Sequence, residues 1–270
     1  MPPRKKQKTS VKSKPTDSGL EVKGTPSAFP DPSLLSRALK QHQHALSLRS
    51  KENKKAPQEL IELDAWLTNG ETGLLAKVAS SQSVNKTDMT SLMKWKLSRG
   101  KSRPTLLALI GSNPEALVLE STSAALQTVR KAKGDLNGAL LALPDACKMK
   151  GVGAATASAL LTLQSPHLLP FMSDEAASFF AGALGEIKYT DSFYKKFAAA
   201  MVDEVRRLNA QTSVSGGWDS MKLERALWTI VVLKKHGQDH VLNPSDDTVE
   251  DEPAALPSTS RSLKRSRDSS

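Results

Sequence analysis

Apolar side chains recur along much of this chain at the three- and four-residue spacing of a helix face. Phe193, Phe197, Met201, Val205 and Leu208 are one such set, and together they would form a continuous buried stripe. No segment shows sustained alternation of apolar and polar residues with the β-branched enrichment of a strand. The pattern therefore predicts an all-α, multi-helix domain.

Capping residues, proline and glycine set the expected limits of these helices. Three of the expected helices span residues 33–49, 136–143 and 173–184. We expect about ten helices in all, arranged as two subdomains with a cleft between them.

Composition divides the chain into three parts. Residues 1–32 are rich in Lys, Ser, Thr and Pro and poor in apolar side chains, so they cannot repay the entropy of ordering. Residues 238–270 return to Pro, Ser and acidic residues. We therefore expect a disordered basic tail, an all-helical domain over residues 33–237, and a disordered tail of mixed charge.

The positive charge is not confined to the tails. Residues 1–24 hold seven basic and two acidic residues, and residues 238–270 hold four basic and seven acidic ones, whereas the whole chain has a net charge of +10. The domain itself must therefore be basic, which favours a polyanionic partner such as DNA.

Other features narrow the class of protein. The single cysteine excludes an internal disulfide and fits a reducing compartment. The chain has neither an apolar run long enough for a membrane span nor a hydrophobic signal core, so we expect a soluble intracellular protein without a membrane partner. His42 and His44 are two residues apart, on different faces of a helix, and no cluster of metal ligands is evident.

A basic cluster close to the N-terminus resembles a nuclear localisation signal. It consists of Arg4, Lys5, Lys6 and Lys8. The alternative is a tail that touches nucleic acid directly. Both alternatives indicate a protein that works near nucleic acid, and we expect it in the nucleus.

A tight turn precedes the most apolar helix. Gly151 and Gly153 flank one apolar residue, and glycine lets the backbone approach a partner closely. The amides that open the following helix have no acceptor within that helix, and such amides suit a phosphate. The candidate DNA contacts here are Lys150, Gly151, Val152, Gly153, Ala154 and Thr156. An ordinary helix corner, in which the glycines only permit close packing, is the alternative.

This stretch resembles the helix-hairpin-helix element of DNA repair proteins, and residues 130–185 resemble the helix-hairpin-helix DNA glycosylase superfamily. In that superfamily the second helix leads to an aspartate that serves the chemistry, and Asp174 stands in a similar place. The resemblance implies that Asp174 stabilises a sugar cation or activates water while the bond to a flipped base breaks. Alternatively, the sequence from Ser173 to Glu175 is simply a capped helix start, and the two interpretations are compatible.

The chain departs from the superfamily at two positions. Bifunctional members carry a lysine two residues after the second hairpin glycine, where this chain has Ala155, so lyase chemistry through that position is excluded. Some members hold an iron-sulfur cluster on four cysteines, and Cys147 cannot build one alone. The resemblance therefore implies no cofactor and, if there is a reaction, a monofunctional one.

The most basic stretch of the domain is a second candidate for DNA contact. Its cations are Lys94, Lys96, Arg99, Lys101 and Arg103. These residues would surround a helix whose other face holds Leu92 and Trp95, and they suit a surface that follows the DNA backbone. A solvated amphipathic helix with Trp95 in the core is the alternative.

Three functional classes follow from the sequence. The first is a nuclear DNA-binding protein of glycosylase-like fold, and the second is a monofunctional DNA glycosylase that uses Asp174. The third is a scaffold that binds other proteins through its helices and tails.

Overall fold

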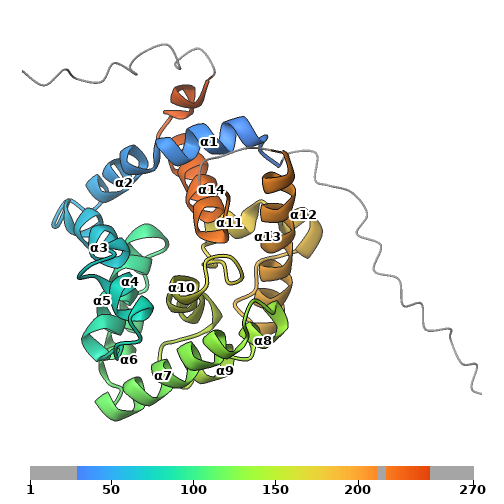
Figure 1. Cartoon of the computed structure of the whole chain (residues 1–270). Coiled ribbons are helices and arrows are strands. Elements are labelled where there is room, and N and C mark those ends of the chain that lie inside the picture. The colour runs from blue at the N-terminus through green and yellow to red at the C-terminus, as the bar shows by residue number, and fades with distance from the viewer. Residues whose placement is uncertain (1–28, 212–216, 244–270) are drawn as a thin grey trace, which may run out of the picture.

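The computed structural model describes residues 29–211 and 217–243, and all the regular structure in these two ranges is helical (Figure 1). The all-α prediction is therefore confirmed for this part of the chain. In order, the helices are α1 (Pro32–Lys40), α2 (His42–Lys51), α3 (Glu59–Thr68), α4 (Leu74–Ala79), α5 (Lys86–Arg99), α6 (Pro104–Gly111), α7 (Glu115–Lys131), α8 (Leu136–Leu140), α9 (Leu143–Ala146), α10 (Ala154–Gln164), α11 (Asp174–Ser178), α12 (Ala181–Leu184), α13 (Asp191–Gln211), α14 (Ser220–Lys235) and the 3-10 helix η1 (Asp239–Leu242).

Helix α10 lies at the centre of the molecule (Figure 1). Its sequence is built from Ala, Ser, Thr and Leu, and every residue from Ala154 to Leu163 is buried. Small side chains on all faces let several helices approach its axis, and α4, α5, α7, α9 and α13 all contact it. The N-terminus of α10 is thereby fixed from several directions.

Helix α14 organises the other half of the fold. It contacts α1, α2, α11 and α13, and its Leu227 and Trp228 are fully buried. Its N-cap is Asp219, whose carboxylate accepts a hydrogen bond from the Lys222 amide at 2.7 Å. The predicted stripe of α13 is buried as well, including Phe193, Phe197 and Met201.

Several expected helices are interrupted. The helix expected over residues 33–49 breaks at Gln41, and both of its halves contact α14. The helix expected over 173–184 divides into α11 and α12. The helix expected over 136–143 divides into α8 and α9, and Leu141 between them is 66% exposed. Tertiary contacts overrode the local periodicity at these places.

The ordered packing extends beyond both expected domain limits. The ring of Phe29 packs edge-on against Phe179 and Phe180, with ring centroids 6.1 and 5.4 Å apart. At the other end Leu242 is buried, and its carbonyl accepts a hydrogen bond from Arg37 Nε at 2.7 Å. Residues 29–32 and 238–243 therefore belong with the helical body.

Two further features concern the residues that the structure describes. None of their helices is both long enough and apolar enough to cross a membrane. Within the same ranges, no group of three or more His, Cys, Asp or Glu side chains is placed to hold a metal ion.

Candidate nucleic-acid interface

Helix α5 carries the basic stretch. It begins with a capping box, in which Asn85 accepts a hydrogen bond from the Asp88 amide while the Asp88 carboxylate accepts one from the Asn85 amide. Trp95 is buried, as expected, and its indole Nε1 donates to Asp64 Oδ1 at 2.9 Å. Because Trp95 faces inward, its neighbours Lys94 and Lys96 are turned toward other faces of the helix.

Arg99 differs from the other cations of this stretch. Only 3% exposed, it donates from both terminal nitrogens to Glu224 Oε2 at 3.2 Å. Its guanidinium also lies within 5.5 Å of the ring centroids of Trp95, Phe171 and Trp228. A guanidinium that is buried and paired in this way is part of the core, so the Arg99 side chain is not exposed for contact with DNA.

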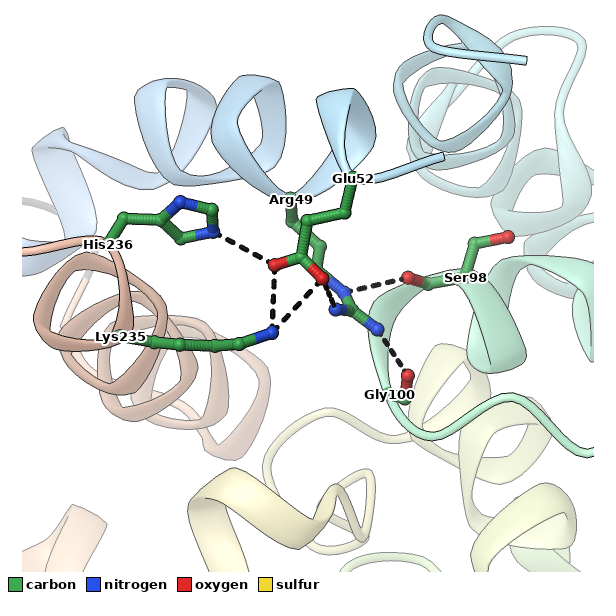
Figure 2. Close-up of polar contacts among 6 residues, drawn as sticks. All are labelled: Arg49, Glu52, Ser98, Gly100, Lys235 and His236. Atoms are coloured by element: carbon green, nitrogen blue, oxygen red, sulfur yellow. Dashed lines mark hydrogen bonds and ion pairs between the residues drawn. The ribbon is translucent and has the colours of Figure 1, made fainter. Parts of the chain in front are cut away.

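The segment that follows α5 is anchored by a charged network (Figure 2). Arg49 of α2 donates from Nε to the Ser98 carbonyl at 3.0 Å, and its terminal nitrogens donate to the Gly100 carbonyl and to Glu52. Glu52 in turn accepts hydrogen bonds from Lys235 and His236 at the end of α14. The start of the 100–103 segment is thus connected to two helices that lie elsewhere in the sequence.

The turn between α9 and α10 requires a glycine at position 151. Gly151 has a φ of +81°, in the left-handed region that L side chains rarely adopt. A Cβ atom there would lie 2.9 Å from Leu109 Cβ and 3.2 Å from the Leu106 carbonyl oxygen. Gly151 therefore permits the turn to pack against α6.

Asn113 clamps the same turn. Its Oδ1 accepts a hydrogen bond from the Lys150 amide at 2.8 Å, and its Nδ2 donates to the Lys150 carbonyl at 3.1 Å. The side chain of Lys150 is exposed above this clamp. The sequence did not single out Asn113, since an Asn before Pro114 indicates only a turn.

Gly153 presents a different environment. It is the N-cap of α10, it has an extended backbone, and a Cβ there would meet no atom within 4 Å. The amides of Gly153, Ala154 and Ala155 donate to no acceptor among the described residues. The side chains of Val152, Ala154 and Thr156 are buried, so at these three positions only the backbone is available to a ligand.

Asp174 both begins a helix and faces a pocket. It is the first residue of α11, whose N-cap is Ser173. Its Oδ1 accepts a hydrogen bond from the Tyr189 hydroxyl at 2.6 Å, and its Oδ2 lies 3.5 Å from Lys101 Nζ. Asp174 is therefore both the first residue of a capped helix and part of the pocket wall.

Tyr189 is the second residue that the sequence did not single out. Its hydroxyl also accepts a hydrogen bond from Arg103 at 3.2 Å, and the Arg103 guanidinium lies 4.8 Å from its ring centroid. Partial burial and the hydrogen bond to Asp174 raise the pKa of Tyr189. Tyr189 thus links the carboxylate to one of the predicted DNA-binding cations.

A pocket lies where part of the basic stretch approaches the first turn of α10, and its lining includes none of the predicted hairpin contacts, which are Lys150, Gly151, Val152, Gly153, Ala154 and Thr156. Its wall includes Lys96, Lys101 and Arg103 from the basic stretch, Ala155 from the start of α10, and Asp174. The cavity has a volume of about 30 Å³, room for a few water molecules. The first turn of α10 and the basic stretch, more than fifty residues apart in sequence, therefore form adjoining parts of one surface.

Lys96 is half-buried in this pocket and has no hydrogen bond or ion pair with any described residue. Burial, and then the nearby charge of Arg103, lower the pKa of its ammonium group. Burial also raises the pKa of Glu175, which lines the pocket beside Asp174. Lys94, by contrast, is exposed and lines a separate cavity with Arg49.

Comparison of the chain with protein-family models, with curated proteins and with solved structures finds no match.

Proposed function

We propose that this chain is a nuclear DNA-binding protein that contacts the DNA backbone through the 150–154 turn and the basic segment that ends at Arg103. The observation that carries the proposal is the pocket that Ala155, in the first turn of α10, lines together with Lys96, Lys101 and Arg103. Unpaired helix amides and lysine or arginine side chains are the groups that bind phosphate. The net charge of +10 supports the same partner.

The proposal also includes the glycosylase-like fold that the sequence resembles and the expected localisation in the nucleus. The proposed localisation signal, Arg4 to Lys8, lies outside the described residues. Lys150, Lys94 and Lys101 have exposed side chains that suit backbone contacts, whereas Gly153 and Ala154 would contribute their amides.

The decisive experiment measures binding of duplex DNA to the full chain over a salt series, with Gly153→Asp beside the parent. An Asp at this position has open space, and as an N-cap it would engage the same amides and preserve the helix. It would also place a negative charge where a phosphate is proposed. We expect the affinity of the parent to fall steeply with salt, and Gly153→Asp to lose most of the binding at low salt.

Gly70→Asp provides the matched control, because Gly70 lies in the exposed turn between α3 and α4 and a Cβ there also meets nothing within 4 Å. The proposal requires this variant to bind much more tightly than Gly153→Asp. Failure of the parent to bind DNA at low salt would overturn the proposal and favour the protein scaffold.

A monofunctional DNA glycosylase is the second candidate, favoured by one observation: Asp174 faces a pocket. However, a cavity of about 30 Å³ is smaller than a nucleobase, and Tyr189 and Lys101 already engage the two carboxylate oxygens. We therefore place this function second. Release of a free base from damaged duplexes by the parent, but not by Asp174→Asn, would establish it.

A further inference from the structure

The pocket beside Asp174 contains a cation that has no hydrogen-bonded partner among the described residues. Lys96 Nζ has no hydrogen-bond acceptor among the described residues, although its side chain is half-buried. Withdrawing an ammonium group from water without pairing it is unfavourable. A bound anion would provide the missing partner.

The surrounding groups strengthen this demand for an anion. Lys101 and Arg103 line the same pocket, so three cations that are not committed to the core face Asp174 and Glu175. Ala155, whose amide has no acceptor among the described residues, also lines the pocket.

The shape of the pocket limits the part of an anion that enters it to a small group. Buried side chains of Phe171 and Met172 line it together with the paired Arg99, so its inner wall belongs to the protein core. A strand cannot continue through such a wall. The volume of about 30 Å³ is smaller than a nucleobase, so a group that enters must be as small as the oxygens of a phosphate.

We propose that this pocket binds a terminal phosphate monoester, the phosphorylated end of a DNA strand, with Lys96, Lys101 and Arg103 as its cationic ligands. Asp174 acts as a positioning residue in this site, because it holds Tyr189 at 2.6 Å and Lys101 at 3.5 Å. The inference rests on the proposed DNA binding and adds to it a preference for strand ends. A phosphate monoester carries more negative charge than an internal diester, and it presents three terminal oxygens to the cations.

The test compares binding of the full chain to short duplexes of one sequence whose ends carry hydroxyl groups, 5′-phosphates or 3′-phosphates. We expect one phosphorylated form to bind about tenfold more tightly than the hydroxyl form, since charge-assisted hydrogen bonds are the strong ones. In Lys96→Met, which keeps an apolar stem of similar length, the ratio should fall to about one. Thermal unfolding of Lys96→Met, compared with the parent, confirms that the variant is folded.

Lys94→Met is the matched control, because Lys94 lies on the same helix but outside the pocket. It should weaken binding to all the duplexes equally and preserve the preference for the phosphorylated end. Equal affinity of the parent for all duplexes would overturn the terminal-phosphate site while leaving the DNA-binding proposal intact.

A further measurement distinguishes failure of the DNA-binding proposal from failure of the terminal-phosphate proposal. If no duplex binds, the DNA-binding proposal fails. A calorimetric titration with inorganic phosphate then shows whether the pocket binds phosphate. Binding by the parent and not by Lys96→Met would support a phosphate site that serves a small phosphate monoester. Absence of phosphate binding by the parent would overturn the site.

Discussion

The side chain of Asn113 hydrogen-bonds to both backbone polar groups of Lys150. It accepts from the Lys150 amide at 2.8 Å and donates to the Lys150 carbonyl at 3.1 Å. The same side chain also donates to the carbonyls of Leu109 and Ile110 at the end of α6. One buried amide group therefore connects the end of α6 to the turn that precedes α10.

Asn113→Ala should reduce the free energy of unfolding by about 1–3 kcal/mol, because it leaves buried backbone groups without partners. Urea denaturation followed by circular dichroism would measure the loss. Asn137→Ala is the control, since Asn137 is exposed and its side chain makes no hydrogen bond within the described residues. If the two variants have equal stability, Asn113 is not the clamp described here.

The two glycines of the turn should respond differently to alanine. Gly151→Ala forces an L side chain into positive φ and places its Cβ 2.9 Å from Leu109 Cβ, so we expect a loss of about 1–3 kcal/mol. Gly153→Ala meets open space and should cost less than about 1 kcal/mol, the effect of a poorer N-cap. Similar losses in denaturation experiments on the two variants would contradict the assigned turn geometry.

The buried pair of Arg99 and Glu224 predicts a large effect. Glu224→Gln removes the charge that faces a guanidinium only 3% exposed, and it should cost about 3–5 kcal/mol of unfolding free energy. Asp203→Asn, which breaks the exposed pair with Arg206, should change stability by less than about 1 kcal/mol. Chemical denaturation at one pH and salt concentration compares them, and the inverse ranking would show that the buried pair is not structural.

His42 predicts a pH dependence of stability. It is 5% exposed, its Nδ1 lies 3.0 Å from Thr229 Oγ1, and its ring packs edge-on against Trp228. Burial, and then the charges of Arg99 and Arg225, hold the pKa of His42 well below the ordinary value of 6.5. Near pH 6.5 the His42 imidazole is therefore protonated more often in the unfolded chain than in the folded chain.

This contribution to stability is complete above about pH 7 and is lost as the pH falls below 6.5, with a slope that approaches about 1.4 kcal/mol per pH unit. Denaturation at a series of pH values measures it. His42→Gln should remove this component of the slope, whereas His44→Gln, at an exposed position, should retain it. A slope unchanged by His42→Gln would assign the pH dependence to other groups.

Periodicity was sufficient to predict the elements whose stability comes from one buried face. The stripe from Phe193 to Leu208 and the burial of Trp95 are of this kind. Periodicity could not predict the break at Gln41, because α1 and α2 separately adjust to the surface of α14. The split between α8 and α9 shows the same limit.

Only some residues of the candidate site could be predicted from the sequence. Asp174 and the basic stretch were recognisable as local patterns, but their meeting at one pocket beside Ala155 depends on how α5 packs on α10. The partners that define the site are nonlocal. Asn113 is 37 residues from Lys150, and Glu224 is 125 residues from Arg99. Nothing in the local sequence around Arg99 distinguishes a buried cation from an exposed one.

The network around Arg49 has a consequence for the order in which the molecule is assembled (Figure 2). Arg49 of α2 hydrogen-bonds to the start of the segment that bears Lys101 and Arg103. Glu52, in contrast, pairs with Lys235, which lies 183 residues further along the chain. During synthesis, a nascent chain that still lacks α14 leaves both Glu52 and Arg99 without these partners. The proposed phosphate-binding segment therefore lacks part of its charged support until α14 has docked.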